Sequence, residues 1–330
     1  MSTVAVINAA QLVTVAGPKR PRVGREMSEL GIMTNAAMLI RDGVIAQVGE
    51  IEVPRDAEVV DAGGRVVLPG FVDAHAHPVF AGNRVEEFEL RARGASYEEI
   101  AASGGGIRST VRKTRAATVG ELEDETLKHL RWFLECGTTT VESKSGYGLS
   151  LGDELKMLRV MRDVQSRTPI EIVPTFLGAH AIPDGISTEE YVRCVIEEML
   201  PQIASEHLAE HCDVFCERGY FDLDASRRIL SAAKRHGLKL RMHADQLTNS
   251  GAAVLAAELG AITADHLEQT EEDGIAAMRR RKVQPVLLPA SVYSLGKSRY
   301  PRARDMIDAG LAVVLATDFN PGSSPTPSMP

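Results

Sequence analysis

The sequence has few cysteines, no long apolar run and no leader-like start. The N-terminus lacks the basic segment and cleavable apolar core of a signal peptide. No apolar run approaches the ~20 residues that a membrane-spanning helix needs. Four cysteines in 330 residues are too few for a disulfide framework. These absences argue against a membrane protein or a disulfide-rich secreted protein, and we expect a cytoplasmic one.

Positive charge is also scarce. The chain has 37 Lys and Arg against 45 Asp and Glu, a formal net charge of -8, and a pI of about 5.7. This balance argues against nucleic acid or an anionic membrane as the main partner. A small anionic substrate stays possible, because one local arginine can override the global charge. The length suits one large domain or two ordinary ones.

The first 65 residues have the pattern of β structure. Residues 4–8 form a short apolar segment, and the apolar segments 38–41 and 44–48 flank Asp42-Gly43, which is a strong hairpin signal. We therefore expect a small β domain over residues 1–65, followed by a main domain over residues 66–330.

Strand and helix patterns alternate through the main domain. Eight strands are expected, at Phe71–His75, Thr139–Lys144, Glu171–Gly178, Cys212–Cys216, Leu238–His243, Ala261–His266, Val283–Pro289 and Leu311–Thr317. This alternation predicts a parallel α/β architecture, and the count fits a closed (β/α)8 barrel. An open doubly wound sheet is the alternative, but its first turn would carry a glycine fingerprint that is missing here. Gly104-Gly105-Gly106 follows no clear strand, so we expect a flexible loop near the site, with a phosphate cradle less favoured.

The segment Asp73-Ala74-His75-Ala76-His77 lies at the end of the first expected barrel strand. Side chains alternate along a strand, so His75 and His77 would share one face and could converge on one ion. Histidine is the commonest metal ligand. Two unconnected histidines near a strand end are the alternative, and other strands must supply the remaining ligands.

Polar residues gather at the other strand ends, where barrel enzymes carry their catalytic groups. His243 follows the fifth strand and Asp318 the eighth, which neighbours the first strand in a closed barrel. With His75 and His77 they predict a catalytic metal site with an open position for water. Taken alone, His243 or Asp318 could be a polar residue at a strand end that makes a local hydrogen bond. Cys212 and Cys216 could also hold a metal by their spacing, but they fit small core residues better. The histidines expected on helices or helix ends, with no role, are His129, His207, His211 and His236.

Longer motifs carry a family resemblance. They are Pro69–His77, His77–Arg84, Gly104–Ile107, Lys144–Leu149, Thr175–His180, His243–Gln246 and Thr317–Ser323, together with His266. The barrel motifs resemble the amidohydrolase superfamily, and the Arg84, Tyr147 and Asn320 segments are similar to the imidazolonepropionase family. The resemblance implies a (β/α)8 TIM-like barrel with a small β-sandwich domain built from both chain ends.

The resemblance also implies an activity, which is hydrolysis of 4-imidazolone-5-propanoate to N-formimidoyl-L-glutamate in histidine degradation. One divalent metal per chain, zinc or iron, would be held by His75, His77, His243 and Asp318, and would activate the attacking water. His266 would stabilise the oxyanion and shuttle protons, and Asp318 would pass the water proton to the leaving nitrogen. The family association makes a homodimer plausible.

The resemblance assigns a substrate pocket as well. Arg84 would grip the propanoate through two parallel hydrogen bonds, although alone it could be a solvated arginine. The other implied contacts are Tyr97, Tyr147, His180, Asn320, Gly322 and Ser323; alone, His180 could be a capped strand-end histidine. Gln246 stands where related deaminases, and some imidazolonepropionases, carry a proton-shuttling glutamate. Because glutamine does not ionise, it can only orient or hydrogen-bond the ring.

Two rival functions remain open at this point. One is another mononuclear amidohydrolase, such as a cytosine- or guanine-type deaminase, and the other is a non-catalytic scaffold on the same barrel. Scaffolds usually lose metal ligands, whereas this chain keeps all four. Lys144 could suggest a carboxylated lysine that bridges two metals, but it lies on the second expected strand instead of the fourth, so we predict one metal.

The chain is expected to stop short. Residues 321–330 have the pattern of a loop, whereas a barrel needs a helix after its eighth strand, and the small domain would take C-terminal strands. Unpaired strand edges and an exposed apolar flank favour aggregation. We therefore expect this chain to be less stable than a longer version.

Overall fold

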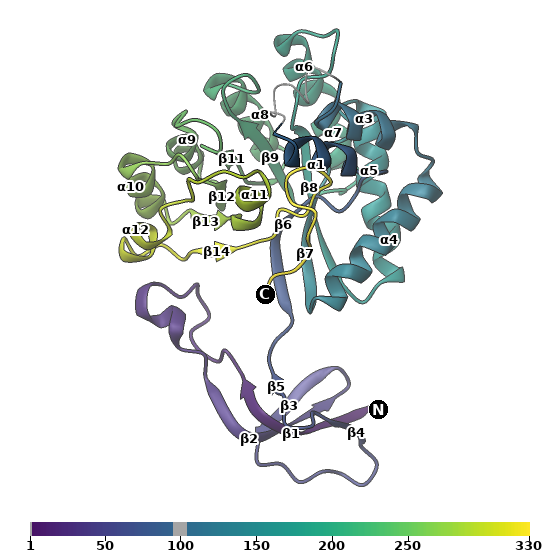
Figure 1. The fold of residues 1–330 in the computed structure, drawn as a ribbon, viewed down its shortest axis with the longest axis vertical. Helices are drawn as coiled ribbons and strands as arrows, with labels where there is room; N and C mark the ends of the chain where they lie inside the picture. The colour runs from purple at the N-terminus through teal and green to yellow at the C-terminus, as the bar shows by residue number, and fades with distance from the viewer. Residues whose placement is uncertain (1, 95–103) are drawn as a thin grey trace. The chain divides into compact units, whose positions relative to one another are not determined.

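The fold consists of two compact units, Met1–Gly70 and Phe71–Pro330. Figure 1 shows the computed structural model, which describes residues 2–94 and 104–330. None of the helices in these two ranges is long and apolar enough to cross a membrane.

The first unit is a five-stranded sheet with the order β3-β2-β1-β4, in which β5 pairs with β1. Its strands are β1 (Thr3–Val13), β2 (Ile32–Arg41), β3 (Val44–Gly49), β4 (Glu58–Asp61) and β5 (Val66–Val67), and a 3-10 turn spans Gly24–Ser28. The expected hairpin joins β2 and β3 in antiparallel register. Asp42 and Gly43 both have positive φ, at 48° and 79°, as a two-residue hairpin turn requires.

The second unit is a parallel sheet with the order β14-β13-β12-β11-β9-β8-β7-β6, in which β10 pairs with β9. Its strands are β6 (Phe71–Ala76), β7 (Thr138–Lys144), β8 (Glu171–Ala179), β9 (His211–Cys216), β10 (Lys239–Leu240), β11 (His243–Ala244), β12 (Thr263–His266), β13 (Gln284–Leu287) and β14 (Val314–Leu315). All the expected barrel strands are therefore present and in sequential order.

The first and last strands meet and close the barrel. A parallel bridge joins Ala76 to Phe319. The His77 amide donates to the Phe319 carbonyl at 2.8 Å, and the Asp318 amide donates to the His75 carbonyl at 3.0 Å. This closure confirms the expected barrel and excludes an open doubly wound sheet. It also brings Asp318 beside the two histidines of β6.

Two strands are more irregular than expected. The fifth is divided into β10 and β11, although the Arg241 amide still donates to the Cys212 carbonyl at 2.9 Å. The eighth ends at Leu315, because the Asp73 carboxylate takes over as acceptor for the Thr317 amide, at 3.1 Å, and for its hydroxyl. A buried side chain thus replaces part of the backbone ladder at the seam of the barrel.

Helices follow the strands around the barrel (Figure 1). They are α1 (Val85–Ala92), α3 (Ile107–Ala116), α4 (Val119–Glu135), α5 (Leu151–Val164), α6 (Thr188–Cys194), a π-helical turn (Val195–Met199), α7 (Leu200–Ser205), α8 (Leu223–Arg235), α9 (Ala252–Leu259), α10 (Glu272–Arg281), α11 (Pro289–Ser294) and α12 (Ala303–Asp308); a 3-10 turn at Gln165–Arg167 follows α5. Thr118 and Ser187 begin α4 and α6 with capping boxes, in which the Glu three residues later bonds back to the cap.

The main apolar core lies in the second unit, between its strands and helices. Cys212 and Cys216 are buried in this core as free thiols. Burial raises the pKa of the Cys212 thiol, with a smaller contribution from Asp213. The two cysteines are therefore core residues, as expected.

Candidate active site

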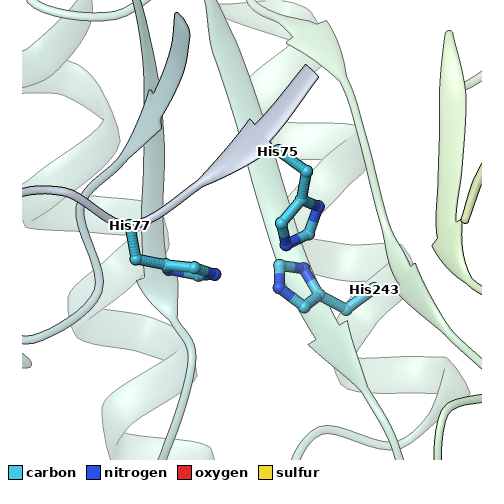
Figure 2. A group of neighbouring side chains, drawn as sticks. All are labelled: His75, His77 and His243. Carbon is cyan, nitrogen blue, oxygen red and sulfur yellow. The ribbon is translucent and has the colours of Figure 1, made fainter. Parts of the chain in front are cut away.

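Three histidines converge at the point where β6 ends and β11 begins. His75 lies on β6, His77 directly follows it, and His243 begins β11. Their ring centroids are 4.5 to 5.7 Å apart, and all three side chains are at most 3% exposed. Figure 2 shows the three imidazoles turned toward one another, and one nitrogen from each lies within 4.8 Å of the others.

Asp318 completes the cluster from the segment after β14. Its Oδ1 lies 3.4 Å from His77 Nε2 and 3.6 Å from His75 Nε2. Burial by itself would raise the pKa of this carboxyl, but the contact with His77 and the nearby His266 more than offset it and hold the pKa at about 2. Asp318 has a positive φ of 54°, a conformation that is uncommon outside glycine and that recurs at functional sites.

The cluster has the properties of a metal site. Nε2 of His75 and of His243 are buried and have no hydrogen-bond partner among the described residues. Leaving such atoms unpaired costs about 1–3 kcal/mol each, and a cation would satisfy both. Burial holds the pKa of His75 well below its ordinary value and also lowers that of His77. Neutral imidazoles beside an ionised carboxylate are the donors that a divalent metal binds.

Two buried aspartates orient these histidines, and we did not assign them from the sequence. Asp265 Oδ2 lies 2.7 Å from His75 Nδ1, and Asp213 Oδ2 lies 3.0 Å from His243 Nδ1. Such carboxylates fix the tautomer and the ring orientation of a metal-binding histidine. One signal was available, because Asp213 interrupts an otherwise apolar strand.

His266 ends β12 beside the cluster. Its ring centroid lies 5.2 Å from that of His243 and 5.5 Å from that of His75. Burial alone would lower its pKa, but Glu268, whose Oε1 lies 3.4 Å from Nδ1, raises it above the ordinary value. His266 also has a positive φ, at 78°. It can therefore carry a proton more readily than His75 and His77, whose pKa values burial lowers.

The cluster lies in a cavity of about 650 Å³. Eleven residues expected in the site line it, namely His77, Arg84, Tyr147, His180, His243, Gln246, His266, Asp318, Asn320, Gly322 and Ser323, whereas His75 does not. Residues that the sequence did not suggest also line it, among them Phe215, Tyr220, Leu295 and Lys297. Tyr97 lies outside the described residues.

Arg84 reaches the cavity from the loop before α1. Its Nε donates to Glu87 Oε2 at 2.8 Å, and Glu87 Oε1 accepts from the Gly106 amide at 2.9 Å. The guanidinium lies against Gly322, where an added Cβ would be 2.1 Å from Nη1. A larger residue at position 322 would therefore displace the guanidinium from this position, and Glu87 connects Arg84 to the glycine-rich segment.

Asn320 organises the loop that follows Asp318. Its Oδ1 accepts from the amides of Gly322 and Ser323, at 2.8 and 2.7 Å. Its Nδ2 donates to Ser323 Oγ at 2.8 Å and to the Asp318 carbonyl at 2.6 Å. The side chain is therefore engaged within its own loop, and it shapes the wall next to Arg84.

Another part of the cavity wall is aromatic. His180 stacks on His77 with centroids 5.2 Å apart and an interplanar angle of 15°, and Tyr147 lies 5.4 Å from His180. His180 Nδ1 lies 3.1 Å from the Gly146 carbonyl. Burial holds the pKa of His180 well below its ordinary value, so this wall presents a neutral imidazole to a ligand.

Of the histidines that were expected on helices or helix ends with no role, His129 lies on a helix as expected and His211 does not. His211 begins strand β9, so its expected helical position is wrong. The strand that was expected from Cys212 starts one residue earlier, at His211. His129 is buried on α4, where its Nδ1 lies 2.7 Å from the Pro78 carbonyl and its ring stacks on Phe80. It thereby supports the turn that follows His77.

Comparison with known proteins places this site in a family. Residues 58–133 match a model described as the amidohydrolase family. An imidazolonepropionase of Solibacter usitatus is 60% identical over all of this chain and 81% of its own length. The chain belongs to the imidazolonepropionase family. Another family member, from Geobacillus kaustophilus, is 47% identical over 98% of this chain and 79% of its own length.

Solved structures of more distant proteins share the fold. A guanine deaminase from C. acetobutylicum superposes with a TM-score of 0.69 at 14% identity, and covers 99% of this chain and 77% of its own. A 5-methylcytosine deaminase from Klebsiella pneumoniae gives 0.67 at 17% identity, with 96% and 76% covered. At these identities the likeness establishes the barrel architecture and nothing about the ligand.

Proposed function

We propose that this chain hydrolyses 4-imidazolone-5-propanoate to N-formimidoyl-L-glutamate, the activity expected of the imidazolonepropionase family. One observation carries the proposal: His77, His243 and Asp318 of the buried three-histidine, one-aspartate cluster line the same cavity as the Arg84 guanidinium. The first suits hydrolysis of a ring amide, and the second suits a substrate that carries a carboxylate.

We propose that His75, His77, His243 and Asp318 hold one divalent metal ion, zinc or iron. A bound ion of this kind lowers the pKa of a water molecule toward neutrality and so supplies the nucleophile. Lys144 does not serve as a carboxylated bridge to a second ion, because its ammonium is paired with Glu142 and Asp213. Burial lowers the pKa of Lys144, but these carboxylates raise it above the ordinary value.

The proton transfers are assigned to two residues. Asp318 is ionised near neutral pH, so it accepts the proton of the attacking water and passes it to the ring nitrogen that leaves. His266 donates a hydrogen bond to the carbonyl oxygen, on which negative charge develops. Gln246 lines the same cavity and hydrogen-bonds the ring without exchanging a proton.

The substrate is positioned by the walls of the cavity. Arg84 uses the guanidinium edge that Glu87 leaves free to bind the propanoate. Tyr147 and His180 pack on the planar ring, and the loop from Asn320 to Ser323 closes the side next to Arg84. The expected cytoplasmic location and homodimer stay predictions.

The test combines metal analysis with an optical assay. Purified protein should contain one zinc or iron per chain and should abolish the ultraviolet band of the imidazolone, and a strong chelator should stop turnover. His243→Ala should lose both the metal and the activity, whereas His236→Ala, at an exposed histidine, should keep them. Metal-loaded protein that leaves the imidazolone intact but deaminates guanine or cytosine would overturn the proposal.

A further inference from the structure

A buried ionic network lies on the barrel strands beside the candidate metal cluster. Barrel interiors are normally packed with branched apolar side chains. Here the inward side chains include Glu142 and Lys144 on β7, Asp213 on β9, Arg241 between β10 and β11, and Asp265 on β12, each at most 5% exposed. Burying charges is costly unless they are paired, so this network needs an explanation beyond packing.

Lys144 is at the centre of the network. Its Nζ lies 2.7 Å from Asp213 Oδ2, 2.9 Å from Glu142 Oε1 and 3.8 Å from Asp265 Oδ2. Its side chain is completely buried. One ammonium therefore contacts carboxylates from three different strands.

Two of these carboxylates are the ones that orient the metal cluster. The Asp213 oxygen bound by Lys144 is the same Oδ2 that lies 3.0 Å from His243 Nδ1. The Asp265 oxygen near Lys144 is the same Oδ2 that lies 2.7 Å from His75 Nδ1. Lys144 thus contacts the two aspartates that contact His243 and His75. These two candidate ligands come from opposite sides of the barrel.

Arg241 cannot replace Lys144 in this position. Its guanidinium contacts Asp265 at 3.0 Å and lies 3.6 Å from Glu142. In the ranges that the structure describes, however, the ion pairs of Asp213 are made with Lys144 and His243 alone. Without Lys144, three buried carboxylates would share one cation and would repel one another.

We propose that Lys144 is a positioning residue of the metal centre, whose ammonium holds Asp213 and Asp265 where they fix the imidazoles of His243 and His75. This deepens the proposed function and rests on it. Lys144, on the second barrel strand, would thus support metal affinity through ion pairs. It would not act as a carboxylated lysine that bridges two metal ions.

The proposal is tested by removing the ammonium without adding net charge to the network. Lys144→Met alone leaves an unpaired carboxylate and could prevent folding. The double variant Lys144→Met with Glu142→Gln removes one cation and one anion together, so the net charge of the network stays as it was. Lys156→Met is the matched control, because Lys156 is also largely buried but donates to the carbonyls of Thr114, Arg115 and Ala117, away from the cluster.

The readout is the affinity for Zn²⁺, measured in competition with a chromophoric chelator, with the visible spectrum of the Co²⁺ form as a second signal. Loss of an outer partner of a metal ligand typically weakens binding by about 10–100-fold. We expect this loss, and a changed Co²⁺ spectrum, for the double variant. The Lys156→Met protein should bind Zn²⁺ within about twofold of the original chain.

The outcomes separate this inference from the function on which it rests. Suppose that the original chain binds Zn²⁺ and consumes the imidazolone, and that the folded double variant has the same Zn²⁺ affinity and Co²⁺ spectrum. This result would overturn the role of Lys144 and leave the proposed function standing. An original chain that binds no divalent metal would overturn the proposed function and this inference together.

Discussion

Two parts of the cavity, its floor and its rim, differ in what holds their side chains. The floor is the proposed metal site, made of His75, His77, His243 and Asp318, and its residues lie in or next to barrel strands. The rim is Arg84 with the loop from Asn320 to Ser323, and its residues lie in connections. Both parts contribute residues to the lining of one cavity, so the comparison isolates the effect of their supports.

The floor is supported from outside its own segments. His75 depends on Asp265, which is 190 residues away in the chain, and His243 depends on Asp213. The seam between β6 and the last strand sets the position of Asp318. The geometry of the floor therefore exists only when the whole barrel is closed.

The rim is supported mainly by its own neighbours. Glu87, three residues along the chain, holds Arg84, and Asn320 accepts hydrogen bonds from the amides two and three residues ahead. Loops of this kind can change without disturbing the strands. If the proposed function holds, the floor sets the type of chemistry and the rim sets the substrate, so variants of the two should affect different kinetic constants.

The largest effect is expected for His266, beside the floor. His266→Asn should lower kcat by about 10²–10⁴-fold, because it removes an acid–base group without removing a metal ligand. The KM and the metal content should stay close to those of the original chain, as measured by steady-state kinetics and metal analysis. A wild-type kcat in this variant would remove His266 from the proposed mechanism; His236→Asn serves as the control.

A smaller effect, on a different constant, is expected at the rim. Arg84→Met should raise KM for the anionic substrate by about 10–100-fold, because hydrogen bonds to a charged group contribute about 1.5–3 kcal/mol. It should change KM little for the uncharged amide of the same substrate. Arg108→Met, at an exposed arginine paired with Asp184, is the control. Equal losses for both substrates would contradict a role in binding the carboxylate.

The smallest effect is expected for His211, the first residue of β9, and it concerns the stability of the fold. Burial, with the charge of Arg241, lowers the pKa of His211 from 6.5 to about 4. As the pH falls, the unfolded chain therefore binds this proton first. The stability that the neutral imidazole confers is complete above pH 6.5 and is lost as the pH falls toward 4.

This effect can be measured by urea unfolding. Between pH 7 and pH 4.5 the loss in unfolding free energy should be smaller in His211→Gln than in the original chain, by roughly 1–3 kcal/mol. His236→Gln, at an exposed position, should keep the full pH dependence. An identical pH dependence in all three proteins would show that His211 makes no such contribution.

Much of the fold and of the floor could be predicted from the sequence. Strand and helix patterns alternate with clear caps, and parallel strands in a closed barrel end on one face, so His75, His77, His243 and Asp318 could be placed together from their order alone. The short β14 and the divided fifth strand could not be predicted, because the Asp73 side chain and the barrel seam decide where those ladders end.

The sequence by itself determined the barrel and the donor atoms of the floor, because hydrophobic periodicity and strand order are local properties of the chain. Only the tertiary structure decided which charges support those donors. The contacts of Lys144 with Asp213 and of Asp265 with His75 join strands far apart in sequence, and no pattern in either segment specifies its partner. Their strength depends on burial, which exists only when the barrel has closed around them.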